Sequence, residues 1–393
     1  MIETPPFSKC FLILTEDCNL RCKYCYENTN RCNNNYMSFD TAKKSADFLF
    51  DNALKHGIKS LKWTFFGGEP LLNLDVLIKF FRYAIEKANQ LKIDLVFSLV
   101  TNGTIYNNKY EEFILEWHKI SKSISIQIST DGIPEVQDKN RTTVSGMPTS
   151  QIVLENISKL KKLFGHNQIK TSSLNTHSVI TKDTISKVFL SYEYFKKLGI
   201  NDISFALSDE KDWNENDISV YIEQLSLIAD FIYDECVMSG SLSPYQNAHI
   251  FIGLKSAISK NTCEAGKTFC AITPNGDIYP CDRTCFSNHD FRIGNVFDGI
   301  ADNSNRKMFF ETFRSDMHAD NINCGKCDNT ECKICMTQNY EQFNDVLKCN
   351  PSVCSIYKAK WDFIIKTKKK FDKLSNKLNY NKCDEMTFFK ALN

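Results

Sequence analysis

The chain has 393 residues, a formal net charge of +1 and 42% hydrophobic residues. This length is two to three times the ~150 residues of an average domain, so we expect one large domain with at least one appended unit. The composition is that of a globular protein, which excludes an intrinsically disordered or collagen-like chain. The nearly balanced charge gives no general attraction to nucleic acid or membranes, and we expect neither as a partner.

Cysteine is the unusual component, with 17 residues, an odd number. Residues 1–14 lack the basic and apolar segments of a signal peptide, and no later stretch reaches the ~18 apolar residues of a membrane span. We therefore expect a reducing, cytoplasmic location. Clustered thiols there are metal ligands more often than disulfide partners.

Apolar, β-rich runs alternate with amphipathic stretches through the first half of the chain. The predicted strands are residues 10–14, 61–66, 93–100, 124–128, 174–180 and 203–207. The predicted helices are residues 42–56, ended by Gly57, then 74–88, 110–120, 152–164, 185–198 and 218–237. Strands that are each followed by a helix predict a parallel sheet with right-handed crossovers. Periodicity alone leaves open whether this sheet is a doubly wound layer or an incomplete barrel.

The pattern changes after this region. Residues 263–354 are dense in Cys, Gly, Asn and Asp and show few periodic helices. This composition indicates loops folded around ligands rather than around an apolar core. A last helix is predicted from residue 355 to about residue 378, followed by a tail.

The strongest local motif is Cys18-Asn-Leu-Arg-Cys22-Lys-Tyr-Cys25, directly after the first predicted strand. In parallel α/β layers, ligands bind at the carboxyl ends of strands. Three thiolates on one loop can hold three corners of a 4Fe-4S cubane, leaving its fourth iron open to an exogenous ligand. The alternative is a structural zinc knuckle completed by Cys10 or Cys32.

The segment Gly67-Gly68-Glu69-Pro70 ends the second predicted strand. Two glycines allow a backbone to approach a ligand closely, and the carboxylate of Glu69 can accept a hydrogen bond from an amine. Alone, such a segment is more often a turn. Beside the cysteine loop it indicates a site.

Together these two motifs resemble those of radical S-adenosylmethionine (SAM) enzymes, which place a CxxxCxxC loop after the first strand and a GGEP-like motif after the second. The resemblance implies a partial (β/α)6 TIM-like barrel and SAM bound to the open iron. Reduction of the cluster would cleave SAM to a 5'-deoxyadenosyl radical, which abstracts hydrogen from the substrate.

The same resemblance implies a set of SAM contacts. Tyr24 would lie by the adenine, Gly67, Gly68 and Glu69 would hold the methionine end, and Ser129 and Asp131 would reach the ribose, with Asn102 and Arg141 completing the set. For Asn102, Ser129 and Asp131 the alternative is turn and capping chemistry.

A second group of cysteines begins at Cys263 and Cys270 and continues with Gly276-x4-Cys281, Cys324-x2-Cys327-x4-Cys332-x2-Cys335 and Cys354. The two CxxC pairs could form one zinc site. Eight thiols fit two four-cysteine clusters better, and their order resembles the SPASM extension of radical SAM enzymes. The resemblance assigns one auxiliary 4Fe-4S cluster to Cys263, Cys270, Cys281 and Cys335, and a second to Cys324, Cys327, Cys332 and Cys354.

The spacing departs from the usual CxxCx5CxxxC of this extension, since both later gaps are one residue shorter. Cys349 is the alternative to Cys354 as the last ligand. Three cysteines in the loop and eight in the extension leave six others: Cys10, Cys32, Cys236, Cys285, Cys349 and Cys383. We expect Cys10 and Cys236 to be buried as small apolar side chains, while Cys285 and Cys349 lie among the ligands.

Asp282 follows Cys281 directly, and in anaerobic sulfatase-maturating enzymes the aspartate at this place deprotonates the substrate side chain. A carboxylate removed from water could have a raised pKa suited to base catalysis. The alternative is a solvated or supporting carboxylate. We therefore treat Asp282 as the candidate catalytic residue.

The resemblance divides the chain into a radical SAM barrel (residues 8–240), a SPASM domain (241–365) and a C-terminal helix and tail (366–393). It implies a maturase that oxidises a ribosomally made peptide to form a thioether or carbon–carbon crosslink, using SAM and three 4Fe-4S clusters. The alternatives are a sulfatase maturase that converts Cys or Ser to formylglycine, and a non-catalytic iron–sulfur electron carrier. Expected partners are the peptide substrate and an electron donor such as flavodoxin or ferredoxin. Because the first motif begins by residue 10, either a separate leader-binding protein or the barrel itself would have to bind the leader.

Overall fold

The computed structural model describes residues 6–27, 35–121, 124–170, 174–246, 248, 263–301, 304–312, 335–346 and 348–378. Cys32, Cys324, Cys327, Cys332 and Cys383 lie outside these ranges.

The six predicted strands are confirmed and form one parallel sheet. They are β1 (Lys9–Thr15), β3 (Ser60–Gly67), β4 (Asp94–Thr101), β5 (Ile126–Ser129), β7 (Leu174–Ile180) and β8 (Asp202–Leu207). Each pairs in parallel with the next in this order. Within the described residues the sheet remains open, with β8 at one edge. It is a partial barrel, and the doubly wound alternative is wrong because no strand order reverses within it.

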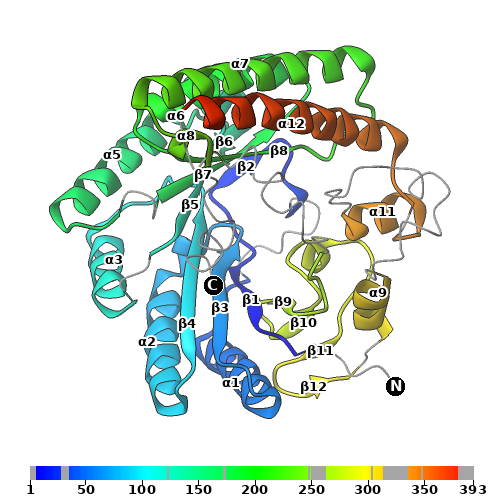
Figure 1. Ribbon diagram of the computed structural model, residues 1–393. Helices are drawn as coiled ribbons and strands as arrows, with labels where there is room; N and C mark the ends of the chain where they lie inside the picture. The colour runs from blue at the N-terminus through cyan, green and yellow to red at the C-terminus, as the bar shows by residue number, and fades with distance from the viewer. Residues whose placement is uncertain are drawn as a thin grey trace.

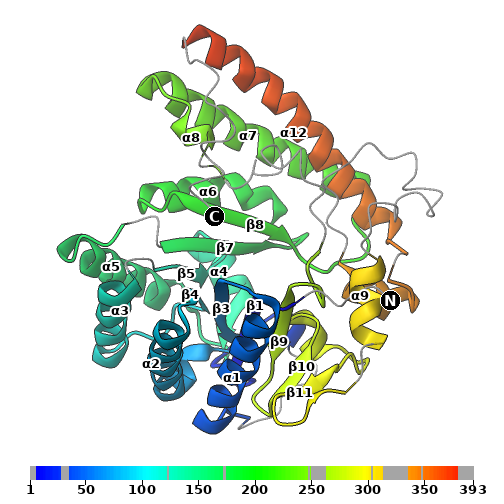
Figure 2. The ribbon, with the colours of Figure 1, turned by 60° about the horizontal axis from the view of Figure 1, so that its bottom comes forward.

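Helices cover the outer face of this sheet (Figures 1 and 2). They are α1 (Phe39–His56), α2 (Leu74–Leu91), α3 (Asn108–Ser121), α5 (Ser150–His166), α6 (Val188–Lys197) and α7 (Glu215–Ser239). Ser38 caps the start of α1, and Gly57 ends it in the left-handed conformation, as predicted. Buried side chains of these helices and of β1, β3 and β4 form the main core. The predicted helix at residues 185–198 is divided into a 3-10 turn, η4 (Ile185–Lys187), and α6.

The elements that the sequence did not predict include two short strands near the cysteine loop. β2 (Leu20–Cys22) lies within the cysteine loop and pairs antiparallel with β6 (Arg141–Thr143), which follows α4 (Pro134–Asn140). Strands of three residues are too short to show periodicity. Their pairing places Cys22 opposite Arg141, and so attaches the cysteine loop to the segment after β5.

The cysteine-rich segment extends the same sheet at the other side of β1. β9 (Phe269–Ile272) pairs in parallel with β1, and β10 (Asp277–Tyr279), β11 (Gly294–Asn295) and β12 (Gly299–Ile300) follow in antiparallel order. Next come α9 (Ser304–Thr312) and α11 (Met336–Phe343). A small second core forms here from Ala265, Phe291, Phe309, Met336 and Val346. The expectation of loops without an apolar core is therefore corrected.

The last helix, α12 (Pro351–Lys377), begins four residues earlier than predicted, because the Asn350 side chain caps it and a proline occupies its first position. It lies beside α7 in both views (Figures 1 and 2), where the rings of Tyr233 and Phe371 are 5.8 Å apart. The expected domain boundary at residue 365 falls inside this helix. In the described part of the chain, no helix is both long and apolar enough to cross a membrane.

Candidate active site

The cysteine loop and the Gly-Gly-Glu loop are held together by backbone hydrogen bonds. The amide of Gly68 donates to the Thr15 carbonyl at 3.0 Å, and the amide of Glu69 donates to the Asp17 carbonyl at 2.9 Å. A Cβ atom at residue 68 would lie 2.1 Å from the Asp17 carbonyl oxygen. Glycine at this position is therefore required for the approach of the two loops.

Glu69 is fully buried, with 0% exposure. Its carboxylate accepts hydrogen bonds from the Asn102 amide at 2.7 Å, the Thr101 hydroxyl at 2.8 Å and the Leu71 amide at 3.1 Å. Burial nevertheless raises the pKa of Glu69 to about 7, because desolvation outweighs these donors. This carboxylate therefore joins the ends of β3 and β4 and can change its charge near neutral pH.

Asn102 connects this pair of loops to the cysteines. Its side-chain amide lies 3.7 Å from the Cys18 sulfur and donates to the Asn19 side-chain oxygen at 2.8 Å. Its own side-chain oxygen accepts from the Thr104 amide at 3.0 Å, which is the turn geometry of the alternative interpretation. Asn102 thus shapes a turn and also contacts Cys18, a predicted metal ligand, while its contact with SAM stays a prediction.

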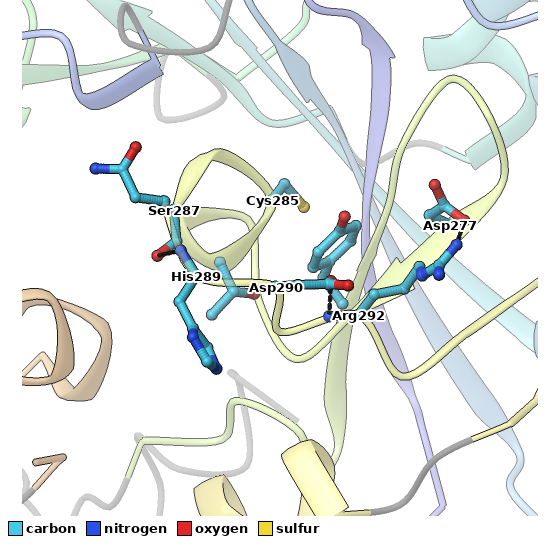
Figure 3. A pocket seen from close by; sticks show the side chains of 9 residues that line it. Asp277, Cys285, Ser287, His289, Asp290 and Arg292 are labelled. Carbon is cyan, nitrogen blue, oxygen red and sulfur yellow. Dashed lines mark hydrogen bonds and ion pairs between the residues drawn. The ribbon is translucent and has the colours of Figure 1, made fainter. Parts of the chain in front are cut away.

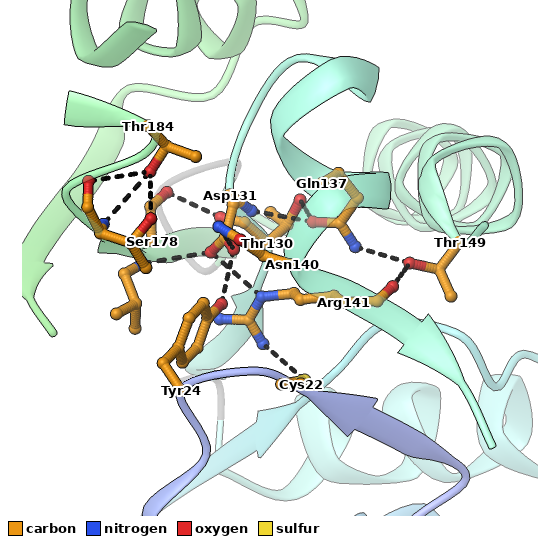
Figure 4. A network of polar contacts seen from close by, with 12 residues as sticks. Cys22, Tyr24, Thr130, Asp131, Gln137, Asn140, Arg141, Thr149, Ser178 and Thr184 are labelled. Atoms are coloured by element: carbon orange, nitrogen blue, oxygen red, sulfur yellow. Dashed lines mark hydrogen bonds and ion pairs between the residues drawn. The ribbon is translucent and has the colours of Figure 1, made fainter. Parts of the chain in front are cut away.

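A buried ion pair lies beside Cys22 and Tyr24 of the cysteine loop (Figure 4). The Arg141 Nε donates to the Asp131 carboxylate at 3.0 Å, with side-chain exposures of 6% and 0%. Tyr24 donates to the other oxygen of Asp131 at 2.5 Å, and the guanidinium stacks over the Tyr24 ring at 5.2 Å. Arg141 also lies 4.0 Å from the Cys22 sulfur. A guanidinium beside a thiol favours the thiolate, the form that binds metal.

The residues that support this pair are Gln137 of α4 and Thr149, which directly precedes α5. The Gln137 side-chain oxygen accepts from the Asp131 amide at 2.9 Å, and its amide donates to the Thr149 hydroxyl at 2.9 Å. The Thr149 hydroxyl donates to the Arg141 carbonyl at 2.5 Å (Figure 4). These contacts fix the orientation of Asp131 and Arg141. Ser129 ends β5 opposite His177 of β7.

His177 was missed by sequence reasoning. Burial, together with the positive charge of Arg141, lowers the pKa of His177 to about 4. Its Nδ1 lies 2.8 Å from the Ser204 hydroxyl of β8. A neutral imidazole therefore lies near the Asp131–Arg141 pair, and only the spatial arrangement of β5, β7 and β8 could reveal it.

Asp282 contacts the cysteine loop directly. Tyr26, the residue after Cys25, donates to the Asp282 carboxylate at 2.9 Å. Burial raises the pKa of both Asp282 and Tyr26. The sequence reasoning named Asp282 but missed Tyr26, whose partner lies 256 residues away.

Arg283 connects this pair to the barrel. Its guanidinium stacks over the Tyr26 ring at 4.8 Å and forms an ion pair with Asp209, which follows β8. Gln338 of α11 donates to the same Asp209. Three segments distant in the sequence therefore meet around Tyr26: the end of β8, the segment after β10, and α11.

The auxiliary cysteines are divided by the fold. Burial raises the pKa of both Cys263 and Cys281, and a smaller interaction with Cys335 contributes to each shift, so these three thiols lie in one neighbourhood. Cys270, assigned to the same cluster, is instead hydrogen-bonded to Cys10. Within the described residues, no three His, Cys, Asp or Glu side chains come together as ligands of a single ion.

Cys349 and Cys354 both lie at the start of α12. A hydrogen bond from Cys349 lowers the pKa of Cys354 to about 6, so the two competing ligands are adjacent. Cys10 and Cys236 are buried, with 1% and 0% exposure, as predicted.

A polar cavity of about 330 Å³ lies beside the auxiliary segment (Figure 3). Its lining includes Tyr279, Cys285, His289 and Arg292. The Cys285 sulfur lies 3.5 Å from the Cys281 carbonyl oxygen, so the cavity borders the segment that carries Cys281.

The fold is a parallel partial barrel whose first strand ends in a three-cysteine loop. A buried Gly-Gly-Glu loop lies beside the cysteines. Together these features define a cluster-binding α/β protein. The sequence model of the Radical SAM superfamily matches residues 12–189, and that of the SPASM iron–sulfur cluster-binding domain matches residues 263–336. The chain therefore belongs to the radical SAM superfamily and carries a C-terminal SPASM domain.

Two curated relatives match most of the chain. The chain is 25% identical over 336 residues to a cysteine-type anaerobic sulfatase-maturating enzyme of Clostridium novyi, covering 82% of this chain and 83% of the relative. It is 23% identical over 380 residues to the radical SAM cyclopropyl synthase TigE of Paramaledivibacter caminithermalis, covering 88% and 71%.

Solved structures show the same fold. The structure of anSMEcpe with bound AdoMet superposes with a TM-score of 0.73 at 22% identity, covering 98% of each chain. SuiB of Streptococcus suis superposes with a TM-score of 0.55 at 17% identity, covering 89% of this chain and 77% of SuiB.

The raised pKa of Glu69 predicts a pH-dependent stability. Between its ordinary pKa of 4.5 and about 7, the folded protein retains a proton that the unfolded chain releases. The free energy of unfolding of the cofactor-free protein should therefore fall by about 3 kcal/mol as the pH rises through this window. Glu69→Gln should remove this fall in urea denaturation series, whereas Glu112→Gln, at an exposed position of α3, should retain it. An unchanged pH dependence in Glu69→Gln would contradict the assignment.

Proposed function

We propose that the protein is a radical SAM maturase that oxidises a ribosomally made peptide and forms a thioether or carbon–carbon crosslink. The observation that carries this proposal is the contact between Tyr26 and Asp282, because it places a residue of the cysteine loop against a buried carboxylate of the auxiliary segment. A candidate base lies where the two cluster-binding segments meet. The relatives support a peptide or protein side chain as substrate, since they include a cyclopropyl synthase and sulfatase-maturating enzymes.

The residues present fit an iron–sulfur cluster and SAM. Cys18, Cys22 and Cys25 would hold the cluster, and the Asn102 and Arg141 donors next to two of their sulfurs favour the charged thiolates. The proposed SAM contacts are Tyr24, Gly67, Gly68, Glu69, Asn102, Ser129, Asp131 and Arg141. When bound, the reduced cluster and SAM supply the radical that removes hydrogen from the substrate.

The chain's own residues supply proton transfer and orientation. Asp282 would accept a proton from the substrate side chain, since burial raises its pKa toward the range of a general base. Tyr26 donates to this carboxylate and fixes its direction. Arg283, held by Asp209, stacks on Tyr26 and so orients the pair.

A sulfatase maturase, oxidising Cys or Ser to formylglycine, is the second candidate. It is favoured by the match over 82% of the chain to a cysteine-type anaerobic sulfatase-maturating enzyme. The cyclopropyl synthase relative, which spans 88% of the chain, supports the first candidate. A short peptide reading frame beside the gene would support the first candidate, and a sulfatase gene the second. A simple electron carrier is disfavoured, because such a protein has no use for the Asp282–Tyr26 pair or the buried Glu69 loop.

The remaining assignments are also proposals. They are three 4Fe-4S clusters, an electron donor such as flavodoxin or ferredoxin, a leader-binding partner, a cytoplasmic location, and division into residues 8–240, 241–365 and 366–393.

The radical function predicts SAM cleavage that depends on the cysteine loop. After anaerobic reconstitution, the protein should hold about twelve irons, four for each of three cubanes. With SAM and dithionite it should form 5'-deoxyadenosine, measured by liquid chromatography. Replacing Cys18, Cys22 and Cys25 together by Ala should abolish this product, whereas Cys236→Ala, within the core on α7, should not. Formation of 5'-deoxyadenosine by the triple variant would contradict the proposal.

The proposed base predicts a separation of SAM cleavage from product formation. Asp282→Asn keeps the shape of the side chain and loses the acceptor charge, so peptide modification should fall about 100-fold or more. 5'-Deoxyadenosine formation should stay close to that of the unmodified protein. Mass spectrometry of the peptide and chromatography of the nucleoside measure the two separately. Asp298→Asn, at an exposed position, is the control. Full peptide modification by Asp282→Asn would assign Asp282 a supporting role.

A further inference from the structure

Cys270 lies in a place unsuited to a cluster ligand. It is on β9, in register with Cys10 of β1, and both side chains are at most 1% exposed in the main core. The Cys10 thiol is hydrogen-bonded to Cys270, and the Cys270 sulfur lies 3.7 Å from the Lys9 carbonyl oxygen. Cys270 is therefore packed as a small apolar side chain between two paired strands.

The β9–β10 hairpin separates Cys270 from the other proposed ligands. Ile272 of β9 pairs with Ile278 of β10, and these two residues share the main core with Cys270. Tyr279 and Cys281 instead contact the second core, which contains Met336 at the start of α11. Since neighbouring strand residues face opposite sides of a sheet, the Cys270 side chain lies on the face of β9 opposite to that of Ala271, the partner of Tyr279.

The other thiols gather near α11. The Cys281 sulfur lies 4.0 Å from the Thr337 hydroxyl, two residues after Cys335. Cys263 is two residues before Ala265, a member of the second core. Three cysteines of the assigned set thus lie around one core, and Cys270 belongs to another.

Cys285 is the next thiol after Cys281 in the chain. It is on the 3-10 turn η6 (Arg283–Phe286), with its sulfur 3.5 Å from the Cys281 carbonyl oxygen. It lines the polar cavity together with Tyr279, the residue that shares the second core with Cys281 (Figure 3). The spacing Cys281-x3-Cys285 equals that of Cys18-x3-Cys22, so one short loop can present both thiols to one cubane.

We infer that the first auxiliary cluster is held by Cys263, Cys281, Cys285 and Cys335, and that Cys270 is a structural thiol paired with Cys10. This inference rests on the proposed auxiliary cluster. It reassigns the ligand set on the basis of β-sheet register, core membership and the turn that carries Cys285.

The test measures iron and sulfide in the full chain and requires no activity. The parent is the variant with Cys18, Cys22 and Cys25 replaced by Ala, so that only auxiliary clusters remain, and it should hold about eight irons. Adding Cys270→Ala or Cys270→Val should leave about eight irons and an unchanged electron paramagnetic resonance spectrum after dithionite reduction. Adding Cys281→Ala or Cys285→Ala should lower the iron content or change that spectrum. Circular dichroism checks folding, and Cys236→Ala is the matched control for loss of a buried thiol.

The possible outcomes test separately the structural role of Cys270, the ligand role of Cys285 and the presence of auxiliary clusters. Iron loss in a folded Cys270 variant, equal to that in Cys281→Ala, would overturn the reassignment. Eight irons with an unchanged spectrum in Cys285→Ala would overturn the role of Cys285. A parent with fewer than about four irons would instead contradict the auxiliary clusters of the proposed function.

Discussion

The parallel pairing of β9 with β1 is the contact on which the arrangement of the two halves depends. β1 carries the cysteine loop at its end, and β9 begins the cysteine-rich extension. Because the two strands are neighbours, the segment after β10 can reach Tyr26 and place Asp282 against it. The small second core contains few residues and would not by itself fix this position. The main sheet therefore positions the extension.

The cysteine loop is held from two sides by different kinds of interaction. On one side, glycine lets the loop after β3 approach closely enough for backbone hydrogen bonds to Thr15 and Asp17. On the other side, the β2–β6 pairing and the Asp131–Arg141 ion pair fix Cys22 and Tyr24. Such a buried pair needs further hydrogen bonds to offset its desolvation, and the Tyr24 hydroxyl and the Val179 amide donate them to the Asp131 carboxylate. This rigidity suits a site in which the ligands must be in place before the cofactor binds.

Much of the barrel could be predicted from sequence, because its strands and helices have clear periodicity and caps. Gly57 and the run of residues 174–180 are examples in which local chemistry and fold agree. The three-residue strands β2 and β6 and the Tyr26–Asp282 contact could not be predicted, since they depend on pairing between distant segments. Cys270 shows the same limit: the resemblance to the SPASM extension implies a ligand, whereas the strand register and the packing of β9 place its side chain in the main core.

Transfer of hydrogen from a peptide is the most direct test of the central claim that this site performs radical chemistry on a peptide side chain. The holoprotein would be incubated with SAM, a reductant and the candidate peptide carrying deuterium on its carbon-bound positions. Mass spectrometry would then measure the label in 5'-deoxyadenosine. The account predicts deuterium in this product, with a matching loss from the modified peptide. A modified peptide accompanied by unlabelled 5'-deoxyadenosine would contradict it.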